Sequence, residues 1–145
     1  MIDLTQFWKD HPEYDGLYKE YAVYPLVWNP LAANAVQQQS DTTVGMDADF
    51  VATNLYGTQT TAVTNAAFIA TPLIMGLIYT GAGTRNVTNV KVEWTSVVGT
   101  AGNPRVYWPY PILIPKATQF SAQMDNPQAV ASNVWLSIHG VKIFY

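Results

Sequence analysis

The fold is decided by one stretch of sequence, Asn133-Val134-Trp135-Leu136-Ser137-Ile138-His139-Gly140-Val141-Lys142-Ile143-Phe144. The aliphatic side chains of Val134, Leu136 and Ile138 alternate with Trp135, Ser137 and His139. Successive side chains of a β-strand point to opposite faces, so this period of two predicts a strand with one buried face. Gly140 lies inside the run, and a glycine there indicates a bulge or the close approach of another backbone.

Short segments of the same kind fill the chain after Gly45. Residues 90–95 alternate most regularly, and turn signals such as Gly81-Ala82-Gly83 and Asp125-Asn126-Pro127 separate the segments. No helical period intervenes, and strands without crossover helices are mostly antiparallel. The sequence therefore predicts a mainly β protein, an antiparallel β-sandwich or jelly roll of about eight strands with a short helical N-terminal arm.

The N-terminal region has a different pattern. A spacing of i, i+3, i+4 and i+7 predicts a helix with one aromatic-rich face, formed by Tyr14, Leu17, Tyr18 and Tyr21. Pro25 and Pro30 stop any helix, and the polar run Gln37-Gln38-Gln39 is typical of a linker. We expect a helical or extended arm over residues 1–31, a polar linker over 32–46 and a β-sandwich domain over 47–145.

Composition limits the class of protein. The chain has 145 residues, 12% charged, 49% hydrophobic and 13% aromatic, with nine Tyr, five Trp and no Cys. So many aromatic residues and so few charges argue against disorder and predict surface that is buried against another protein. The net charge of -3 gives no reason to expect nucleic-acid binding. The absence of a signal-peptide pattern and of a long apolar run predicts a cytoplasmic product without membrane contact.

The charges are distributed unevenly along the chain. Residues 1–49 contain eight acidic and two basic residues, whereas residues 50–145 contain five basic and two acidic ones. Two interpretations stay open: attraction between the two regions, within a molecule or between copies, or a solvated face on the N-terminal segment.

The sequence offers little for catalysis. His11 and His139 are the two histidines, and no Gly-x-Ser-x-Gly elbow accompanies them. Asp47 and Asp49, with Asp41 upstream, are too few for the six to eight oxygen ligands of calcium. We expect no enzyme activity, no catalytic residue, no metal site and no cofactor.

Aromatic residues are the informative group. They crowd the first 28 residues and pack either on the β-body or on another chain, where such residues make hot spots. We predict an interface formed by Phe7, Trp8, Tyr14, Leu17, Tyr18, Tyr21, Tyr24 and Trp28. A second group is interpreted as an interface or a glycan-stacking platform, with a core corner as the alternative: Tyr107, Trp108 and Tyr110.

Four stretches carry a resemblance to a known family: residues 47–50, 111–116, 120–126 and 133–144. Over roughly residues 47–144 the chain resembles small virion structural proteins of tailed bacteriophages. The resemblance implies a β-sandwich or jelly-roll module that assembles with other proteins, and it brings no catalytic residues.

The predicted function is a capsid decoration or cement protein that binds and stabilises the lattice of the major capsid protein. The expected partners are the major capsid protein or other virion structural proteins and further copies of this chain, without nucleic acid or membrane. The expected location is the virion, after synthesis in the bacterial cytoplasm. The alternatives are a neck, tail or fibre-base component, or a carbohydrate- or receptor-binding module.

Overall fold

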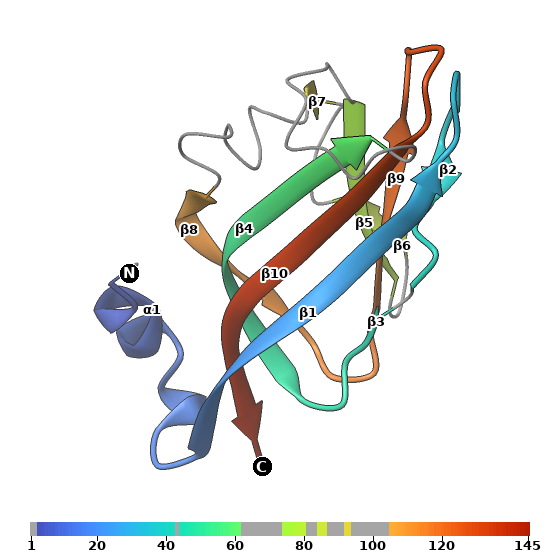
Figure 1. Ribbon diagram of the computed structural model, residues 1–145. Coiled ribbons are helices and arrows are strands. Elements are labelled where there is room, and N and C mark those ends of the chain that lie inside the picture. Colours follow the sequence, from blue (N-terminus) through green and yellow to red (C-terminus); the bar gives the residue numbers. More distant parts are fainter. Residues whose placement is uncertain (1–2, 43, 62–73, 81–83, 87–91, 94–104) are drawn as a thin grey trace.

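A computed structural model describes residues 3–42, 44–61, 74–80, 84–86, 92–93 and 105–145 (Figure 1). The side chains that it describes are those of residues 3–42, 44–60, 110–119 and 121–145. Most of the predicted strand at 90–95 and the predicted turn at 81–83 lie outside these residues, and of that strand only Val92–Glu93 is described.

The described elements are two short helices followed by strands. In chain order they are α1 (Thr5–Asp10), the 3-10 helix η1 (Pro12–Tyr14), β1 (Tyr18–Leu31), β2 (Gln38–Gln39), β3 (Val44–Gly45), β4 (Asp49–Thr61), β5 (Ile74–Thr80), β6 (Thr84–Asn86), β7 (Val92–Glu93), β8 (Arg105–Ile114), β9 (Gln119–Asp125) and β10 (Ser132–Phe144).

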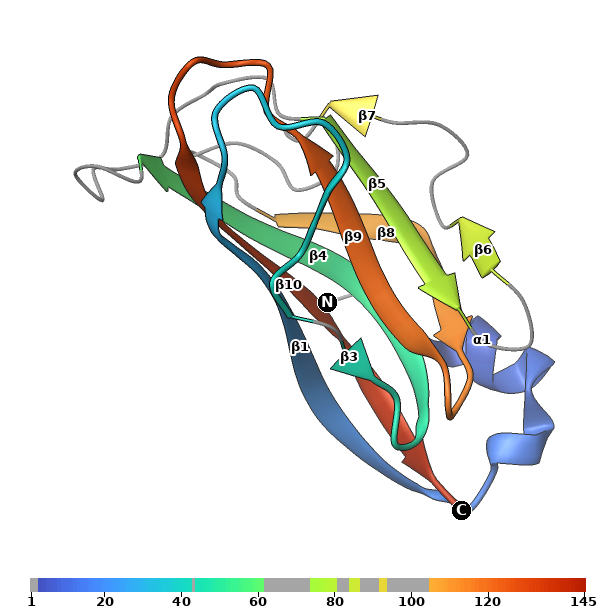
Figure 2. The same cartoon turned by 90° about the vertical axis from the view of Figure 1, so that its right-hand side faces the viewer.

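The strands form two sheets that face each other. The first sheet has the order β1-β10-β4-β8, and the second has the order β2-β9-β5-β6, with β3 on β9 and β7 on β5. Every pairing between these strands is antiparallel. Figure 2 shows β5 and β9 on one side of the space between the sheets and β1, β10 and β4 on the other. The predicted antiparallel β-sandwich is confirmed.

The main core fills the space between the sheets. Alternate residues of β10 point into it, as their spacing predicts, and meet inward side chains of β1 and β4. Among the described side chains, Trp28 and Phe50 are the largest that are completely buried there. The cluster consists of Leu26, Trp28, Leu31, Val44, Met46, Phe50, Ala52, Leu55, Ile114, Ala122, Met124, Val134, Leu136 and Ile138.

Gly140 lies at a β-bulge and at a close approach of two backbones, as the sequence predicts. His139 pairs with Asn54 and Gly140 pairs with Ala52, so Thr53 is one extra residue in β4. A Cβ atom on residue 140 would lie 2.1 Å from the carbonyl oxygen of Val51. Only glycine fits this position without a shift of the backbone.

The predicted helix with Tyr14, Leu17, Tyr18 and Tyr21 on one face is wrong. Helical structure ends at Tyr14, and the two later tyrosines lie in β1. Pairing with β10 continues without a break from Tyr18 to Trp28, and this long ladder outweighs a weak local helix propensity. Residues 18–31 are therefore an edge strand of the sandwich, and β2 and β3 of the predicted linker pair with β9.

Candidate protein-interaction surface

The outer face of the first sheet is a candidate surface for protein interaction. Val23, Pro25 and Val27 of β1 lie opposite His139, Ser137 and Trp135 of β10, respectively. The neighbouring positions of β4 continue this row as Asn54, Tyr56 and Thr58. Val23 is 43% exposed and Trp135 37% exposed, so large apolar groups meet solvent here. In Figure 1 the second sheet lies behind this part of β4, β10 and β1.

Formal charge is absent from the strand segments that make this face. No Asp, Glu, Lys or Arg occurs in residues 21–31 of β1, 50–61 of β4 or 132–141 of β10. Soluble proteins rarely expose a large contiguous face of this kind unless another molecule covers it, and interface centres are depleted of charge and rich in aromatic rings. We call the face formed by Tyr21, Val23, Pro25, Val27, Tyr56, Thr58, Trp135, Ser137 and His139 the uncharged face.

The helical N-terminal segment covers the other end of the same sheet. Phe7 and Tyr14 are buried there against Val51 and Ile143, which lie on the outer side of β4 and β10. The partly buried side chains around this second cluster are Leu4, Trp8, Leu17 and Leu113. Figure 1 shows α1 beside the lower part of β10.

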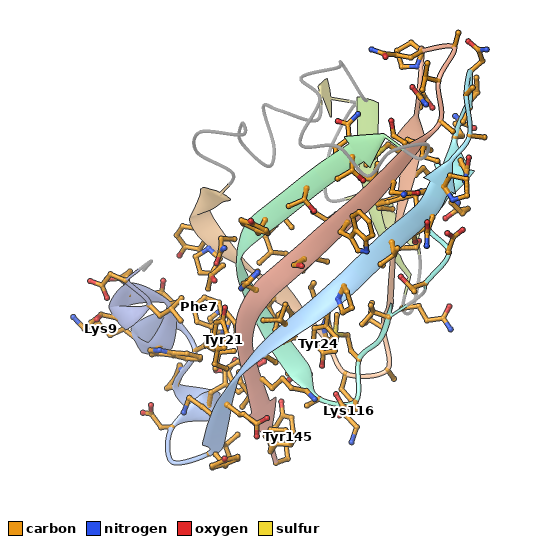
Figure 3. All side chains as sticks on the ribbon, viewed as in Figure 1. Phe7, Lys9, Tyr21, Tyr24, Lys116 and Tyr145 are labelled. Atoms are coloured by element: carbon orange, nitrogen blue, oxygen red, sulfur yellow. The ribbon has the colours of Figure 1, made fainter. Side chains whose placement is uncertain are left out.

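A buried carboxylate fixes this covering segment to the sheet. Asp49 accepts hydrogen bonds from the Tyr14 hydroxyl at 3.1 Å, the Tyr145 hydroxyl at 2.5 Å and the Lys116 backbone N–H at 2.7 Å. Figure 3 places Tyr145 and Lys116 at the same end of the molecule. Four separate segments of the chain therefore meet at one side chain.

These hydrogen bonds change the titration of the groups involved. Burial alone would raise the pKa of Asp49, but the bonds from Tyr145, Lys116 and Tyr14 hold it below its ordinary value. Burial, followed by the hydrogen bond to Asp49, raises the pKa of Tyr14. The cluster therefore holds an ionised carboxylate and two neutral phenols at neutral pH.

A second polar contact lies nearby. Lys142 pairs with Asp47 at 2.8 Å between Nζ and Oδ1, and the Tyr24 hydroxyl donates to Asp47 at 3.1 Å. The hydrogen bond from Lys142 lowers the pKa of Asp47. The carboxylates of Asp47 and Asp49 are thus both engaged by protein groups. Among the described residues no group of three or more His, Asp or Glu side chains could hold a metal ion.

The predicted arm interface is divided by burial. Phe7, Tyr14 and Trp28 are buried within the chain, and Trp8, Leu17 and Tyr24 are partly buried. Tyr18 and Tyr21 remain exposed and are available to a partner. The sequence left open whether the aromatic residues of the arm pack on the β-body or on another chain. Most of them pack within the chain.

The other predicted group is described only in part. The backbone of β8 holds Tyr107 and Trp108, but their side chains lie outside the described ones. Tyr110 is exposed and donates a hydrogen bond to Asp10 at 3.1 Å, which links β8 to α1. On the uncharged face, the hydroxyl of Tyr21 contacts Nδ1 of His139.

Sequence reasoning missed Trp135, Val23 and Val27 as surface residues. The signal was present, because Trp135 alternates with buried Val134 and Leu136. What the sequence lacked was the identity of the neighbouring strands, which turns scattered apolar residues into one face.

Comparisons with known proteins add little. No protein-family model matches the sequence, and no curated protein matches it. A chain in a structure titled "Structure of infectious bursal disease virus Gx strain" matches with a TM-score of 0.30 and 15% identity. The match covers 86% of this chain and 32% of that chain, so this chain spans about a third of its length. Within the described residues no helix is long and apolar enough to cross a membrane.

Proposed function

We propose that this chain is a structural protein of a virus particle and that the uncharged face is buried against other particle proteins. The observation that carries the proposal is the absence of charge from three adjacent strand segments that expose Trp135, Val23 and Tyr21. A permanent assembly protects such a face from water, whereas a free monomer leaves it open to nonspecific association.

The finer assignment is a decoration or cement protein of a tailed bacteriophage that binds the lattice of the major capsid protein. It is supported by the sequence resemblance over residues 47–144 and by a face suited to one stable partner. A neck or tail location uses the same face, and copy number separates the two: a decoration protein is spread over the head in many copies, whereas a neck component forms one ring.

The test places a charge at the centre of the uncharged face. Particles produced without this chain are incubated with the wild-type chain or with Trp135→Glu, and occupancy is measured by sedimentation and quantitative mass spectrometry. We expect Trp135→Glu to bind at least about tenfold more weakly, since burying an unpaired carboxylate opposes association.

Val36→Glu is the matched control, because Val36 is 76% exposed in the loop between β1 and β2. It adds the same charge at a site outside the uncharged face, so its occupancy should equal that of wild type. Full occupancy by a folded Trp135→Glu chain would overturn the role of this face. Absence of binding by the wild-type chain would overturn the virion assignment.

A further inference from the structure

β1 is one of the two edge strands of the first sheet, and its two halves differ. In the upper half, the Val27 N–H donates to the Thr42 hydroxyl at 3.0 Å, and the Val27 carbonyl accepts from the Asp41 N–H at 2.7 Å. The Asn29 N–H donates to the Asp41 carboxylate at 2.6 Å. Residues 41–42 therefore cover this half of the edge.

The lower half has no such cover. Backbone groups of alternate residues in an antiparallel edge strand point away from the sheet, so those of Lys19, Tyr21 and Val23 point the same way as those of Val27. No described residue bonds to these outward N–H and C=O groups. Pro25, which has no N–H, marks the upper limit of the open stretch.

The lysine of this stretch does not cover the open backbone groups. A lysine often guards an exposed edge, but Nζ of Lys19 is turned back to the carbonyl oxygens of Tyr14 and Leu17 at 2.7 and 3.3 Å. Exposed rings flank the open groups instead, since Tyr18 is 66% exposed and Tyr21 62%. The stretch is thus ready to accept another strand.

We propose that β1 pairs with β1 of a second copy of this chain, antiparallel and with Tyr21 on the two-fold axis. Lys19, Tyr21 and Val23 are symmetric about Tyr21, so each outward N–H meets an outward C=O of the second copy over the whole open stretch. The two four-stranded sheets then join into one continuous sheet, and the two uncharged faces become neighbours.

The charges of this stretch are compatible with a second copy in this register and exclude the neighbouring register on Glu20. With Tyr21 on the axis, Lys19 lies opposite Val23 and Glu20 lies opposite Ala22 of the second copy, so no like charges oppose each other. A shift by one residue on the axis to Glu20 would place two glutamates directly opposite, which destabilises a strand pair. The pairing uses the outward backbone groups of the edge strand, whereas the proposed particle contact uses side chains of the uncharged face and is tested at Trp135, which lies in β10 and not on this edge.

The first test is a charge exchange at the axis. The isolated wild-type chain is expected at twice its mass of 16.0 kDa by light scattering. Tyr21→Glu and Tyr21→Lys each bring like charges together at the axis and are expected at 16.0 kDa when measured alone. Mixing the two variants should restore the doubled mass, because glutamate then faces lysine.

Val36→Glu and Val36→Lys are the controls, since they make the same changes at an exposed apolar residue off the edge. Both should keep the doubled mass. A wild-type chain that stays monomeric over a concentration series would overturn the proposal, and so would a Tyr21 variant pair that does not recover on mixing.

The second test reads the register directly. The chain has no cysteine, so Tyr21→Cys introduces a single thiol. Directly opposite residues in a hydrogen-bonded antiparallel pair have Cα atoms about 5.5 Å apart, within the roughly 4.4–6.8 Å that a disulfide spans. Mild oxidation should crosslink Tyr21→Cys and leave Val36→Cys uncrosslinked. Equal crosslinking of both variants would overturn the two-fold register. Dimer mass and particle occupancy are separate readouts on different residues, so failure of one proposal is distinguishable from failure of the other.

Discussion

At the scale of single residues, the carboxylate of Asp49 joins separate parts of the chain. It is buried, and its two oxygens accept three hydrogen bonds from the N-terminal segment, the C-terminal residue and the β8–β9 turn. Removing the charge leaves donors without a suitable acceptor, which costs more than an ordinary surface hydrogen bond.

Asp49→Asn should lower the free energy of unfolding by about 1–3 kcal/mol at pH 7, because the amide NH₂ would face a donor group. The pKa of Asp49 is depressed in the folded chain, so its contribution is present above the unfolded pKa of about 3.9 and is lost as the pH falls through the folded value. Urea unfolding of wild type and variant at a series of pH values measures both effects.

Asp47→Asn is the matched control for that experiment. The Asp47 carboxylate is 64% exposed in its pair with Lys142, so solvent screens it and its loss should matter much less. Equal destabilisation by the two variants would contradict the special role of the buried carboxylate.

Gly140→Ala should destabilise the chain strongly. The added methyl group would lie 2.1 Å from the Val51 carbonyl oxygen and 2.7 Å from Cζ of Phe50, so backbone and core must both move. We expect a loss of about 1–3 kcal/mol or more, as for other overpacked cores. Gly45→Ala is the control, since no atom lies within 4 Å of its added Cβ. Thermal unfolding of both variants checks the difference, and a neutral Gly140→Ala would contradict the close approach.

At the scale of elements, α1 and η1 act as a cover for half of one sheet face. Both helices are short, with six residues in α1 and three in η1. Isolated helices of this length are unstable in water, so burial of Phe7 and Tyr14 holds the cover in place.

Phe7→Ala should release this cover while the sandwich core stays folded. Loss of a buried Phe ring costs roughly 3–5 kcal/mol in a packed core. We expect this to exceed the free energy that holds so short a segment on the sheet. Hydrogen exchange at the amides of Trp8 and Tyr14 should speed up, with β10 amides unchanged. Tyr18→Ala, at an exposed ring, should leave exchange at these amides as in wild type. Slow exchange at Trp8 in Phe7→Ala would show that the cover does not depend on this ring.

At the scale of the whole molecule, strand period predicted the architecture well. The many short strands after Gly45, with no helical period between them, predicted the sandwich, and the glycine at 140 predicted a bulge or a close backbone approach. The strand conformation of Tyr18 and Tyr21 was not predictable in this way, because their spacing fits a helix. Only their pairing with β10 makes them part of a strand. The uncharged face likewise depends on strand order, which no local pattern contains.

The bulge at Thr53 reverses which residues of β4 point outward on its two sides. Above it, Asn54 and Tyr56 lie on the outer side of β4, and below it Val51 and Asp49 lie there. Without the extra residue, strict alternation would turn Phe50 outward and carry Asp49 inward. The single residue inserted into the ladder therefore keeps Phe50 and Leu55 on the inner side of the same strand, while Asp49 lies on the outer side beneath the covering helices.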